Sequence, residues 1–600
     1  MDTTVNLTTL RAAGYEIIVQ GAASPFTLTT EITTPSAGIT HVQLAFSAPS
    51  PQRPAPVTLS WHHPLVNTHL KWHPGAHLNR AIEPNWNPQR FVSRGTTHAP
   101  VYALYGVDDR NALTFALSDA LNAAQLSVGL IEETAQAQCQ ITLFYEPLAP
   151  MQDYTVTLRL DTRPIDYASA LADVSAWWAA MPDYLPGAAP PSAAAPLYST
   201  WYSFHQNLSA REVEDQCRLA RDLGMDVVIV DDGWQTHNNG RGYAYCGDWQ
   251  VNPDKFPDFR QHVEQIHQLG MKYVLWFAVP FLGVHTNAYH RFSDKVLDPD
   301  AVRGWHVLDP RFPEVRSYLI DTCRRFVRDY HIDGFKLDFV DAFLLPQHRQ
   351  PALGGGRDYD SVPEAVDRLL TDVLIELRRL KPDVLIEFRQ SYIGPLMRRY
   401  GNMLRAGDVP NDLTGNRVRT LDVRLLAGST PVHADMLMWH PGEPVESAAM
   451  QIIHSLFAVP QISVLLDKIP AAHQKMLRFY LDFWRQHRDV LLGGQLQPQQ
   501  PGYLYPLVRA STAEKTLVAF YGTTVARIAR LTRTLILVNG TSADEIVLDF
   551  AEAPGDLDLT IQSCTGDSVA AGERATFSAG LHSIPVPNAG VAILSRRDEV

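Results

Sequence analysis

The chain has 600 residues, of which 46% are hydrophobic and 19% charged, a composition typical of folded domains rather than of disordered protein. The formal net charge is −13 and no basic cluster is present, which argues against nucleic acid as a partner. The five cysteines are widely spaced and form no CxxC pair, so we expect reduced thiols rather than a zinc site or a disulfide framework. No signal sequence and no run long enough to span a bilayer is visible, and we therefore expect a cytoplasmic protein with no membrane partner.

The first region, residues 1–186, contains short runs in which apolar and polar residues alternate, such as Tyr15–Val19 and Cys139–Tyr145. Gly, Pro and Asn/Asp separate these runs at intervals typical of an antiparallel sandwich. One helix is expected near Tyr167–Met181. The region is therefore predicted to be an N-terminal β-sandwich domain, and the Pro- and Ala-rich residues 187–196 are predicted to be a linker.

The second region, residues 197–494, alternates short apolar strands with helical stretches. Ser209 and Glu212 form a capping box that predicts a helix ending at Gly224. Eight such βα units in a row predict a (β/α)₈ TIM barrel. Trp305–Leu308 is left over, either as a strand-like segment in a long loop or as an error in the count. The expected barrel strands are Leu197–Tyr202, Val227–Val230, Tyr273–Phe277, Gly334–Phe339, Val384–Phe388, Met403–Ala406, Pro431–Met436 and Gln461–Leu465.

The third region, residues 495–600, returns to the alternating pattern, as in Thr516–Phe520 and Thr534–Gly540. This pattern predicts a small antiparallel β domain that packs on the barrel. The predicted fold is therefore a central (β/α)₈ barrel with a β domain on each side.

Carboxylates gather where the predicted barrel strands end. Asp231 and Asp232 follow the second strand, Asp338 ends the fourth and Asp408 follows the sixth, while Asp435 near the seventh is a weaker member. Active sites of such barrels lie at the carboxyl ends of the strands, so these side chains are expected to converge. Lys336 and Asp338 point to the same side of their strand because side chains alternate. A cation beside Asp338 would keep that carboxylate ionised, as a nucleophile or a charge stabiliser requires.

Such a set of carboxylates suits either glycoside chemistry or magnesium binding. Five tryptophans at or beyond the predicted strand ends favour the sugar, because indole rings pack on the C–H faces of sugar rings. A magnesium site for phosphate would be expected to show a Gly-rich loop, and none stands out. Glu387 is expected to be buried structure or a partner of Arg389. The five tryptophans are Trp201, Trp234, Trp249, Trp276 and Trp439.

Several short motifs occur in the order found in one known family. They are Asp231-Asp232-Gly233-Trp234, Gly247-Asp248-Trp249, Lys255-Phe256-Pro257, Gly270-Met271-Lys272, Leu275-Trp276-Phe277, Leu308-Asp309-Pro310 and Lys336-Leu337-Asp338. Together they resemble the catalytic barrel of the α-galactosidases of glycoside hydrolase family 36. The resemblance covers roughly Trp201–Trp439, and the flanking β domains agree in kind only.

The resemblance implies a role for each matching residue. Asp338 matches the nucleophile and Asp408 the general acid/base, with Asp412 as the reserve candidate for the acid. No cofactor and no metal are implied. The residues that match positions binding or lining the sugar are Asp231, Asp232, Trp276, Arg311, Lys336 and Trp439, and Arg389 is a further candidate for binding the substrate. Two adjacent aspartates can both reach the sugar only if the strand ends there, which Gly233 makes feasible.

One segment departs from the family. After the fifth strand the family often carries a Cys-Ser and triple-Gly-Arg segment, where this chain has residues 388–394 with the sequence FRQSYIG. In the family this segment lines the C2 side of the sugar. The identity of the sugar, galactose or N-acetylgalactosamine or another, therefore stays open.

The function expected from the sequence is a retaining, exo-acting α-galactosidase for small oligosaccharides. A homo-oligomer stays open. An α-N-acetylgalactosaminidase, another α-glycosidase and an α-galactosyl transglycosidase would use the same residues. A magnesium-dependent barrel enzyme and a non-catalytic sugar-binding protein are alternatives from other classes, and the presence of Asp338 beside Lys336 counts against the latter.

Overall fold

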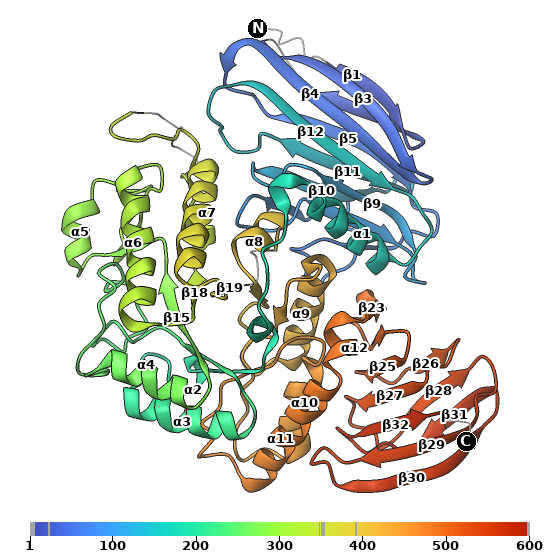
Figure 1. The fold of residues 1–600 in the computed structure, drawn as a ribbon. Coiled ribbons are helices and arrows are strands. Elements are labelled where there is room, and N and C mark those ends of the chain that lie inside the picture. Colours follow the sequence, from blue (N-terminus) through green and yellow to red (C-terminus); the bar gives the residue numbers. More distant parts are fainter. Residues whose placement is uncertain (1–6, 22–24, 347–348, 350–353, 390–392, 597–600) are drawn as a thin grey trace.

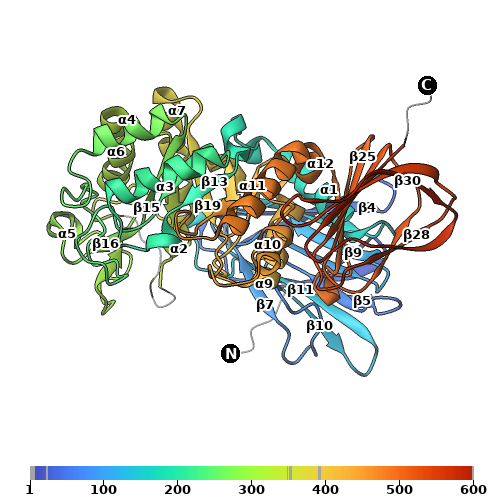
Figure 2. The same cartoon turned by 90° about the horizontal axis from the view of Figure 1, so that it is seen from below.

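The computed structural model describes residues 7–21, 25–346, 349, 354–389 and 393–596. In Figure 1 the N-terminal sheets (blue to cyan) lie above a central α/β body, and the C-terminal sheets (orange to red) lie beside it. Figure 2 shows the helices α3, α4 and α6 at one end of the molecule and the C-terminal strands at the other. Of the described part of the chain, no helix is both long enough and apolar enough to cross a bilayer.

The N-terminal region is a sandwich of two six-stranded antiparallel sheets, as the alternating runs predict. Strand Val57–Pro64 shows why, since every second side chain is buried and the other faces outward. Trp61 and Phe115 meet between the sheets with their ring centroids 4.9 Å apart. The first sheet, in spatial order, consists of β1 (Leu7–Ala12), β2 (Tyr15–Gln20), β5 (Val57–Pro64), β11 (Gln136–Leu143), β10 (Ala124–Ile131) and β7 (Arg90–Ser93). The second consists of β3 (Thr27–Ser36), β4 (Ile39–Gln52), β12 (Met151–Asp161), β9 (Asn111–Leu117), β8 (Val101–Tyr105) and β6 (Leu70–Trp72).

The central sheet contains eight parallel strands, and the predicted count is confirmed. The sheet closes on itself because the amides of Ala434 and Leu437 donate to the carbonyls of Val459 and Gln461, at 3.0 and 2.7 Å. The strands in spatial order are β21 (Val432–His433), β20 (Met403–Arg405), β19 (Leu385–Arg389), β18 (Gly334–Asp338), β15 (Lys272–Ala278), β14 (Val227–Val230), β13 (Leu197–Ser199) and β22 (Gln461–Ile462).

Helices follow these strands and start where the sequence signals predict. Ser209 caps α3, and the last helical residue is Asp222, shortly before Gly224. One expectation is wrong: Trp201 and Tyr202 do not continue the first strand but form the short helix α2. The helices are α1 (Tyr167–Ala179), α2 (Trp201–Phe204), α3 (Ala210–Asp222), α4 (Phe259–Gln268), α5 (Asn287–Phe292), α6 (Pro313–Tyr330), α7 (Val362–Leu380), α8 (Pro395–Tyr400), α9 (Leu413–Ala427), α10 (Val445–His454), α11 (Ala471–Gln486) and α12 (Arg488–Gly493).

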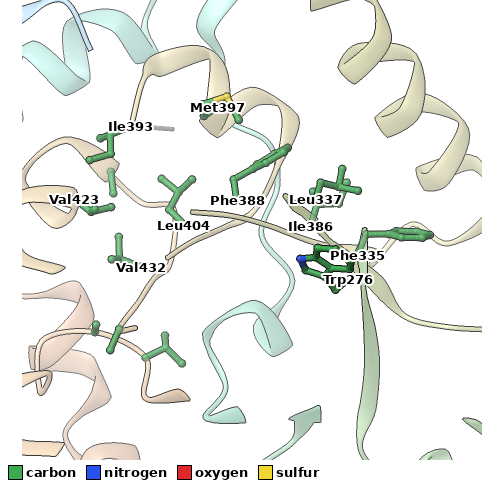
Figure 3. Close-up of a cluster of buried hydrophobic side chains, with 14 of the residues drawn as sticks. Trp276, Phe335, Leu337, Ile386, Phe388, Ile393, Met397, Leu404, Val423 and Val432 are labelled. Carbon is green, nitrogen blue, oxygen red and sulfur yellow. The ribbon is translucent and has the colours of Figure 1, made fainter. Parts of the chain in front are cut away.

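The barrel interior is apolar at the amino ends of the strands and charged at the carboxyl ends. Val227, Ile229 and Leu385 lie in one buried apolar cluster, and Asp231 and Arg389 follow at the alternating positions further along the same chain segments. The outward-facing side chains pack under the helices. Figure 3 shows Phe335, Leu337 and Phe388 among the buried hydrophobic residues of this region.

The predicted linker packs against the barrel through its second half, whereas Ala188, Ala189 and Pro191 are exposed. Ala193 and Ala195 are buried in the apolar cluster at the amino ends of the strands. The amide of Gly187 donates to the carbonyl of Arg398 at 2.7 Å, and the imidazole of His433 lies 2.8 Å from the carbonyl of Ala193. The second half of residues 187–196 therefore contributes to the floor of the barrel.

The leftover segment is a strand outside the barrel. Residues Trp305–Val307 form β17, which pairs antiparallel with β16 (Phe281–Gly283) in a separate two-stranded sheet. This confirms the interpretation as a strand-like segment in a long loop. Aromatic contacts join the sheet to the end of β18, since the rings of Phe281 and Phe339 stack at 4.7 Å.

The C-terminal region has a seven-stranded and a three-stranded sheet. Most neighbours are antiparallel, but the pairs β25–β27 and β26–β28 are parallel, so the expectation of a purely antiparallel domain is corrected. The first sheet contains β23 (Gln495–Gln499), β24 (Leu507–Ser511), β25 (Lys515–Phe520), β27 (Thr534–Asn539), β32 (Val591–Ser595), β29 (Gly555–Gln562) and β30 (Ser568–Phe577). The second contains β26 (Val525–Ile528), β28 (Ile546–Phe550) and β31 (Gly580–Ile584).

A buried carboxylate joins all three regions. Asp422 on α9 of the barrel accepts hydrogen bonds from Trp72 and Arg80 of the sandwich, each at 2.8 Å. The hydroxyl of Tyr505, from the C-terminal region, donates to the same carboxylate at 2.7 Å. We call these four residues the junction.

Candidate active site

Asp338 ends β18 and is held by three donors. Its Oδ1 accepts from the amide of Phe339 at 2.8 Å and from Nε of Arg389, and its Oδ2 accepts from the indole N–H of Trp276 at 3.0 Å. The strand stops here because Phe339 has a φ of 61°, in the left-handed region. Burial acts to raise the pKa of Asp338, but the charges of Arg389 and Lys336 and the Trp276 hydrogen bond outweigh it, so the pKa lies below its usual value. The carboxylate is ionised, as the sequence led us to expect.

The cation that contacts Asp338 is not the predicted one. The ammonium of Lys336 donates to Oδ2 of Asp231 at 2.6 Å, whereas the guanidinium of Arg389 pairs with Asp338. Lys336 acts on Asp338 only through space. The expectation that Lys336 lies directly beside Asp338 is therefore corrected.

Asp408 lies three residues beyond the end of β20, with 45% of its side chain exposed. Nη2 of Arg405 donates to its Oδ1 at 2.8 Å, and Nη1 of Arg389 lies 3.5 Å from its Oδ2. Burial raises the pKa of Asp408, but Arg405, Arg389 and Lys336 together lower it well below the usual range. The same guanidinium thus contacts Asp338 and Asp408, and the free protein keeps both carboxyl groups ionised.

Arg405 is a fully enclosed centre of charge beneath Asp408. It pairs with Asp435 and lies 3.6 Å from Glu387, in addition to its bond to Asp408. The hydroxyl of Tyr202 donates to Asp435 at 2.9 Å. Burial raises the pKa of Asp435 to about 6 despite the charge of Arg405. Glu387 is buried, as predicted, but its arginine partner is Arg405 rather than Arg389.

Asp231 and Asp232 both lie past the last residue of β14. Their side chains therefore need not point to opposite faces, as those of adjacent residues within a strand do. Gly233 makes this turn feasible: its φ is 120°, and a Cβ there would lie 2.5 Å from Cα of Gln206. The carboxylate of Asp232 accepts from the side-chain amides of Gln206 and Gln235, each at 2.7 Å. Burial raises the pKa of Asp232 to about 6, against these two hydrogen bonds.

Metal ligands do not cluster in this region. Among the residues that the structure describes, no group of three or more His, Cys, Asp or Glu side chains is arranged to hold a metal ion. Each carboxylate at the barrel mouth has a cationic or amide partner from the protein instead, as given above for Asp231, Asp232, Asp338, Asp408 and Asp435.

A family model described as melibiase matches residues 193–387. This segment is therefore similar to the melibiase family. The matched segment runs from the barrel floor to Glu387 on β19, and thus includes Asp231, Asp232 and Asp338.

Curated relatives are similar to this chain over part of their own length. Alpha-galactosidase 2 of Pediococcus pentosaceus is 29% identical over 198 residues, which are 32% of this chain and 27% of that protein. The bifunctional α-galactosidase/sucrose kinase AgaSK of Mediterraneibacter gnavus is 25% identical over 317 residues, which are 50% of this chain and 31% of that protein. The alignments therefore span only about a quarter to a third of these relatives.

Solved structures agree over almost the whole chain. The α-galactosidase from Lactobacillus brevis superposes with a TM-score of 0.66 at 14% identity, covering 99% of this chain and 84% of that one. A variant of the family 36 α-galactosidase AgaA from Geobacillus stearothermophilus, in complex with raffinose, gives 0.66 at 16% identity, covering 98% and 82%. The predicted resemblance to glycoside hydrolase family 36 and the predicted architecture are confirmed.

Within the barrel, some of the predicted site residues have other partners. Both terminal nitrogens and Nε of Arg311 are engaged, by the carboxylate of Asp309 and the carbonyl of Asp360. Trp439 is 3% exposed and donates its indole N–H to His473 on α11. Among the described residues, neither Arg311 nor Trp439 makes a hydrogen bond or ion pair with the aspartates at the barrel mouth. Their roles in sugar binding stay predictions.

Four of the five tryptophans also serve the core more than the mouth. Trp234, Trp249, Trp276 and Trp439 are each no more than 3% exposed, and Trp234 donates its indole N–H to the carbonyl of Trp276. Only Trp276 is hydrogen-bonded to a catalytic candidate. Asp412, the reserve candidate for the acid, caps helix α9 by accepting from the amide of Gly415 at 2.8 Å.

The sequence did not single out three residues that the structure brings to the mouth. Arg405 and Tyr202 bind the carboxylates described above. Tyr243 is enclosed by aromatic rings, with Phe281 and Phe339 each at 5.0 Å, and the charges of Asp338 and Asp232 act on its hydroxyl. Of the segment that departs from the family, Gln390, Ser391 and Tyr392 lie outside the described residues.

Proposed function

We propose that this protein is a retaining, exo-acting α-galactosidase that hydrolyses terminal α-D-galactosides of small oligosaccharides. One observation carries the proposal. In a barrel similar to the melibiase family, an ionised carboxylate at the end of β18, Asp338, shares one guanidinium with a second, more exposed carboxylate, Asp408. Oligosaccharides of the raffinose type are the expected substrates, since AgaA, of similar fold, has been solved with raffinose.

In the proposed reaction, Asp338 attacks the anomeric carbon while the bond to the leaving oxygen breaks. Asp408 gives its proton to that oxygen and later takes one from the water that releases the sugar. Retention requires the two carboxyl groups to lie roughly 5–5.5 Å apart. The contact of Arg389 with both groups supports such a short separation.

The acid role requires a change at Asp408 when the sugar binds. In the free protein the pKa of Asp408 is lowered, so the carboxyl is ionised at neutral pH. A sugar that fills the mouth excludes water from the exposed side of Asp408, and desolvation favours the neutral, protonated form. We therefore propose that Asp408 takes up its proton as the complex forms.

The remaining assignments are part of the same proposal. Lys336, Asp231 and Asp232 would bind hydroxyl groups of the sugar, and Trp276 would form a wall beside Asp338. Arg311, Arg389 and Trp439 are retained as candidate substrate-binding residues. The division into residues 1–186, 187–196, 197–494 and 495–600 and a cytoplasmic location also stay proposals; the five unpaired, buried cysteines support a reducing compartment.

The test is the hydrolysis of a panel of p-nitrophenyl α-glycosides, with EDTA present, by wild type and by Asp338→Asn. We expect cleavage of the α-galactoside and a loss of roughly 10⁴-fold or more in kcat in the variant, the scale seen when a covalent nucleophile is removed. Cleavage of a different α-glycoside would contradict the sugar but not the chemistry. Activity that survives Asp338→Asn, or that EDTA abolishes, would overturn the assignment.

A further inference from the structure

Arg389 lies at the barrel mouth between the two candidate catalytic carboxylates. Its Nε donates to Oδ1 of Asp338, its Nη1 lies 3.5 Å from Oδ2 of Asp408, and its guanidinium carbon lies 4.7 Å from the ring centre of Phe339. Only 12% of its side chain is exposed. The planar guanidinium is thus held between the two carboxylates and against an aromatic face, an arrangement that suits arginine and not lysine.

The other cations near the mouth do not contact both carboxylates. Lys336 on β18 is bonded to Asp231, and Arg405 on β20 contacts Asp408 but not Asp338. Arg405 is also shared with Asp435 and Glu387. Within the described part of the chain, Arg389 is therefore the single cation in direct contact with both candidate catalytic carboxylates.

The proposed reaction moves one negative charge between these two groups. Before attack, Asp338 carries the charge and Asp408 carries the proton. When the covalent ester forms, Asp338 loses its charge, and Asp408, having given its proton to the leaving oxygen, gains one. The second step reverses both changes. The pair keeps a net charge of −1 in the complex and in the intermediate, while the position of the charge alternates.

We propose that Arg389 is the shared counter-ion of the reaction, paired with whichever of Asp338 and Asp408 carries the negative charge at each step. The inference rests on the proposed function and names a positioning residue for it. Because one guanidinium reaches both carboxylates, neither step creates a charge at Asp338 or Asp408 that lacks a partner. An unpaired charge in a water-poor site is costly, so a fixed cation that serves both states lowers both barriers.

Other charged and titratable groups face the same carboxylates and must be considered in any test by pH. Lys336 acts from β18, Arg405 from β20, Tyr202 from α2 and Asp435 from the segment after β21. Asp232 and Tyr243 face Asp338 from the loops after β14. Substituting Arg389 leaves all of these groups in place, so a change in the pH profile reports the shared cation.

The experiment is the pH profile of kcat for Arg389→Gln, compared with wild type, because kcat reports the pKa values of the substrate complex, in which Asp408 holds its proton. Asp338 must be ionised, so its pKa sets the acidic limb; Asp408 must be protonated, so its pKa sets the basic limb. Removing a cation raises the pKa of both carboxyl groups, and both limbs are expected to move to higher pH, each by about one unit or more. An unchanged pair of limbs, or the movement of one limb only, would overturn the proposal, because a structural role alone lowers activity without shifting both.

Two further variants keep the test decisive. Arg389→Lys retains the charge, but a single ammonium replaces the several N–H donors of the planar guanidinium. We therefore expect a smaller shift of the two pH limbs and a kcat between those of wild type and Arg389→Gln. If Arg389→Gln does not fold, as judged by thermal melting, an Arg389→Lys profile identical to that of wild type would overturn the proposal. Arg368→Gln is the matched control, since Arg368 lies exposed on α7 and pairs with Asp372 on the same helix; its profile should equal that of wild type.

The same data separate this inference from the proposed function. If wild-type protein cleaves no p-nitrophenyl α-glycoside, the function fails first. If wild type is active and Asp338→Asn is not, the proposed function stands. The role of the shared cation is then decided by the acidic and basic limbs of the pH profile of Arg389→Gln alone. With α-galactosyl fluoride, whose leaving group needs little protonation, the basic limb should weaken while the acidic limb of Arg389→Gln stays shifted.

Discussion

Two clusters in this protein bind carboxylates with arginine, and they differ in how far the carboxylate is shielded from water. At the junction, Asp422 accepts from Arg80, Trp72 and Tyr505, and the side chains of Arg80 and Asp422 are 1% and 3% exposed. At the barrel mouth, Asp408 is bound by two arginines but keeps 45% of its side chain exposed. An enclosed carboxylate suits a joint between domains, whereas an accessible oxygen suits a group that must exchange a proton.

The comparison predicts that the mouth can be altered with little loss of stability. Asp408→Ala should lower the rate on melibiose or raffinose by about 10²–10⁴-fold, the usual contribution of a general acid/base. A substrate with a very good leaving group, such as a dinitrophenyl α-galactoside, should lose far less in the first step. Equal losses on both substrates would remove Asp408 from the acid role and bring Asp412 forward.

The junction should respond in the opposite way. Arg80→Met leaves Asp422 as a buried charge without its cation, which is expected to lower the free energy of unfolding by about 3–5 kcal/mol. Urea unfolding measures the change. Arg110→Met is the matched control, because Arg110 forms an ion pair with Asp108 in which both side chains are more than 60% exposed, and such pairs contribute about 0–1 kcal/mol. Similar effects of the two substitutions would contradict the structural role of the junction.

Asp232 is an intermediate case, closed like Asp422 but bound by neutral amides in place of a cation. Its pKa is raised to about 6 in the folded protein, so the folded state holds the proton more tightly than the unfolded state. The contribution of Asp232 to the free energy of unfolding is therefore fully present below about pH 4 and is lost as the pH rises to about 6.

The measurement is the difference in unfolding free energy between wild type and Asp232→Asn as a function of pH. Between pH 4 and pH 7 wild type should lose up to about 3 kcal/mol relative to the variant, following the shift of the pKa. A constant difference across this range would show that Asp232 is not buried as a poorly compensated acid.

The sequence predicted the barrel well because its signals are local. Runs such as Val227–Val230 are apolar throughout, and carboxylates follow directly after strand ends, so the eight strands and the convergence of Asp231, Asp232 and Asp338 could be inferred. The short helix of Trp201 and Tyr202 was missed because aromatic residues favour strands when tertiary contacts are unknown.

The partners within the site were harder to predict, because they depend on how strands distant in sequence line up. Lys336 was expected beside Asp338, two residues away, yet it bonds to Asp231, 105 residues away in the chain. Arg389 and Arg405 are direct neighbours in the register of β19 and β20, and no sequence pattern signals this pairing. Arg405 belongs to none of the recognised motifs and was therefore not predicted to be a site residue.

The floor of the barrel has a consequence for how such proteins can be recombined. Residues 187–196 connect the sandwich to the barrel, but Ala193 and Ala195 are also part of the barrel's own apolar interior. Most exchangeable domains are bounded by exposed linkers that few contacts cross. A chimera that replaces the N-terminal sandwich must therefore keep residues 187–196. A junction placed directly before Leu197 would remove Ala193 and Ala195 and expose the apolar side chains at the amino ends of the barrel strands to water.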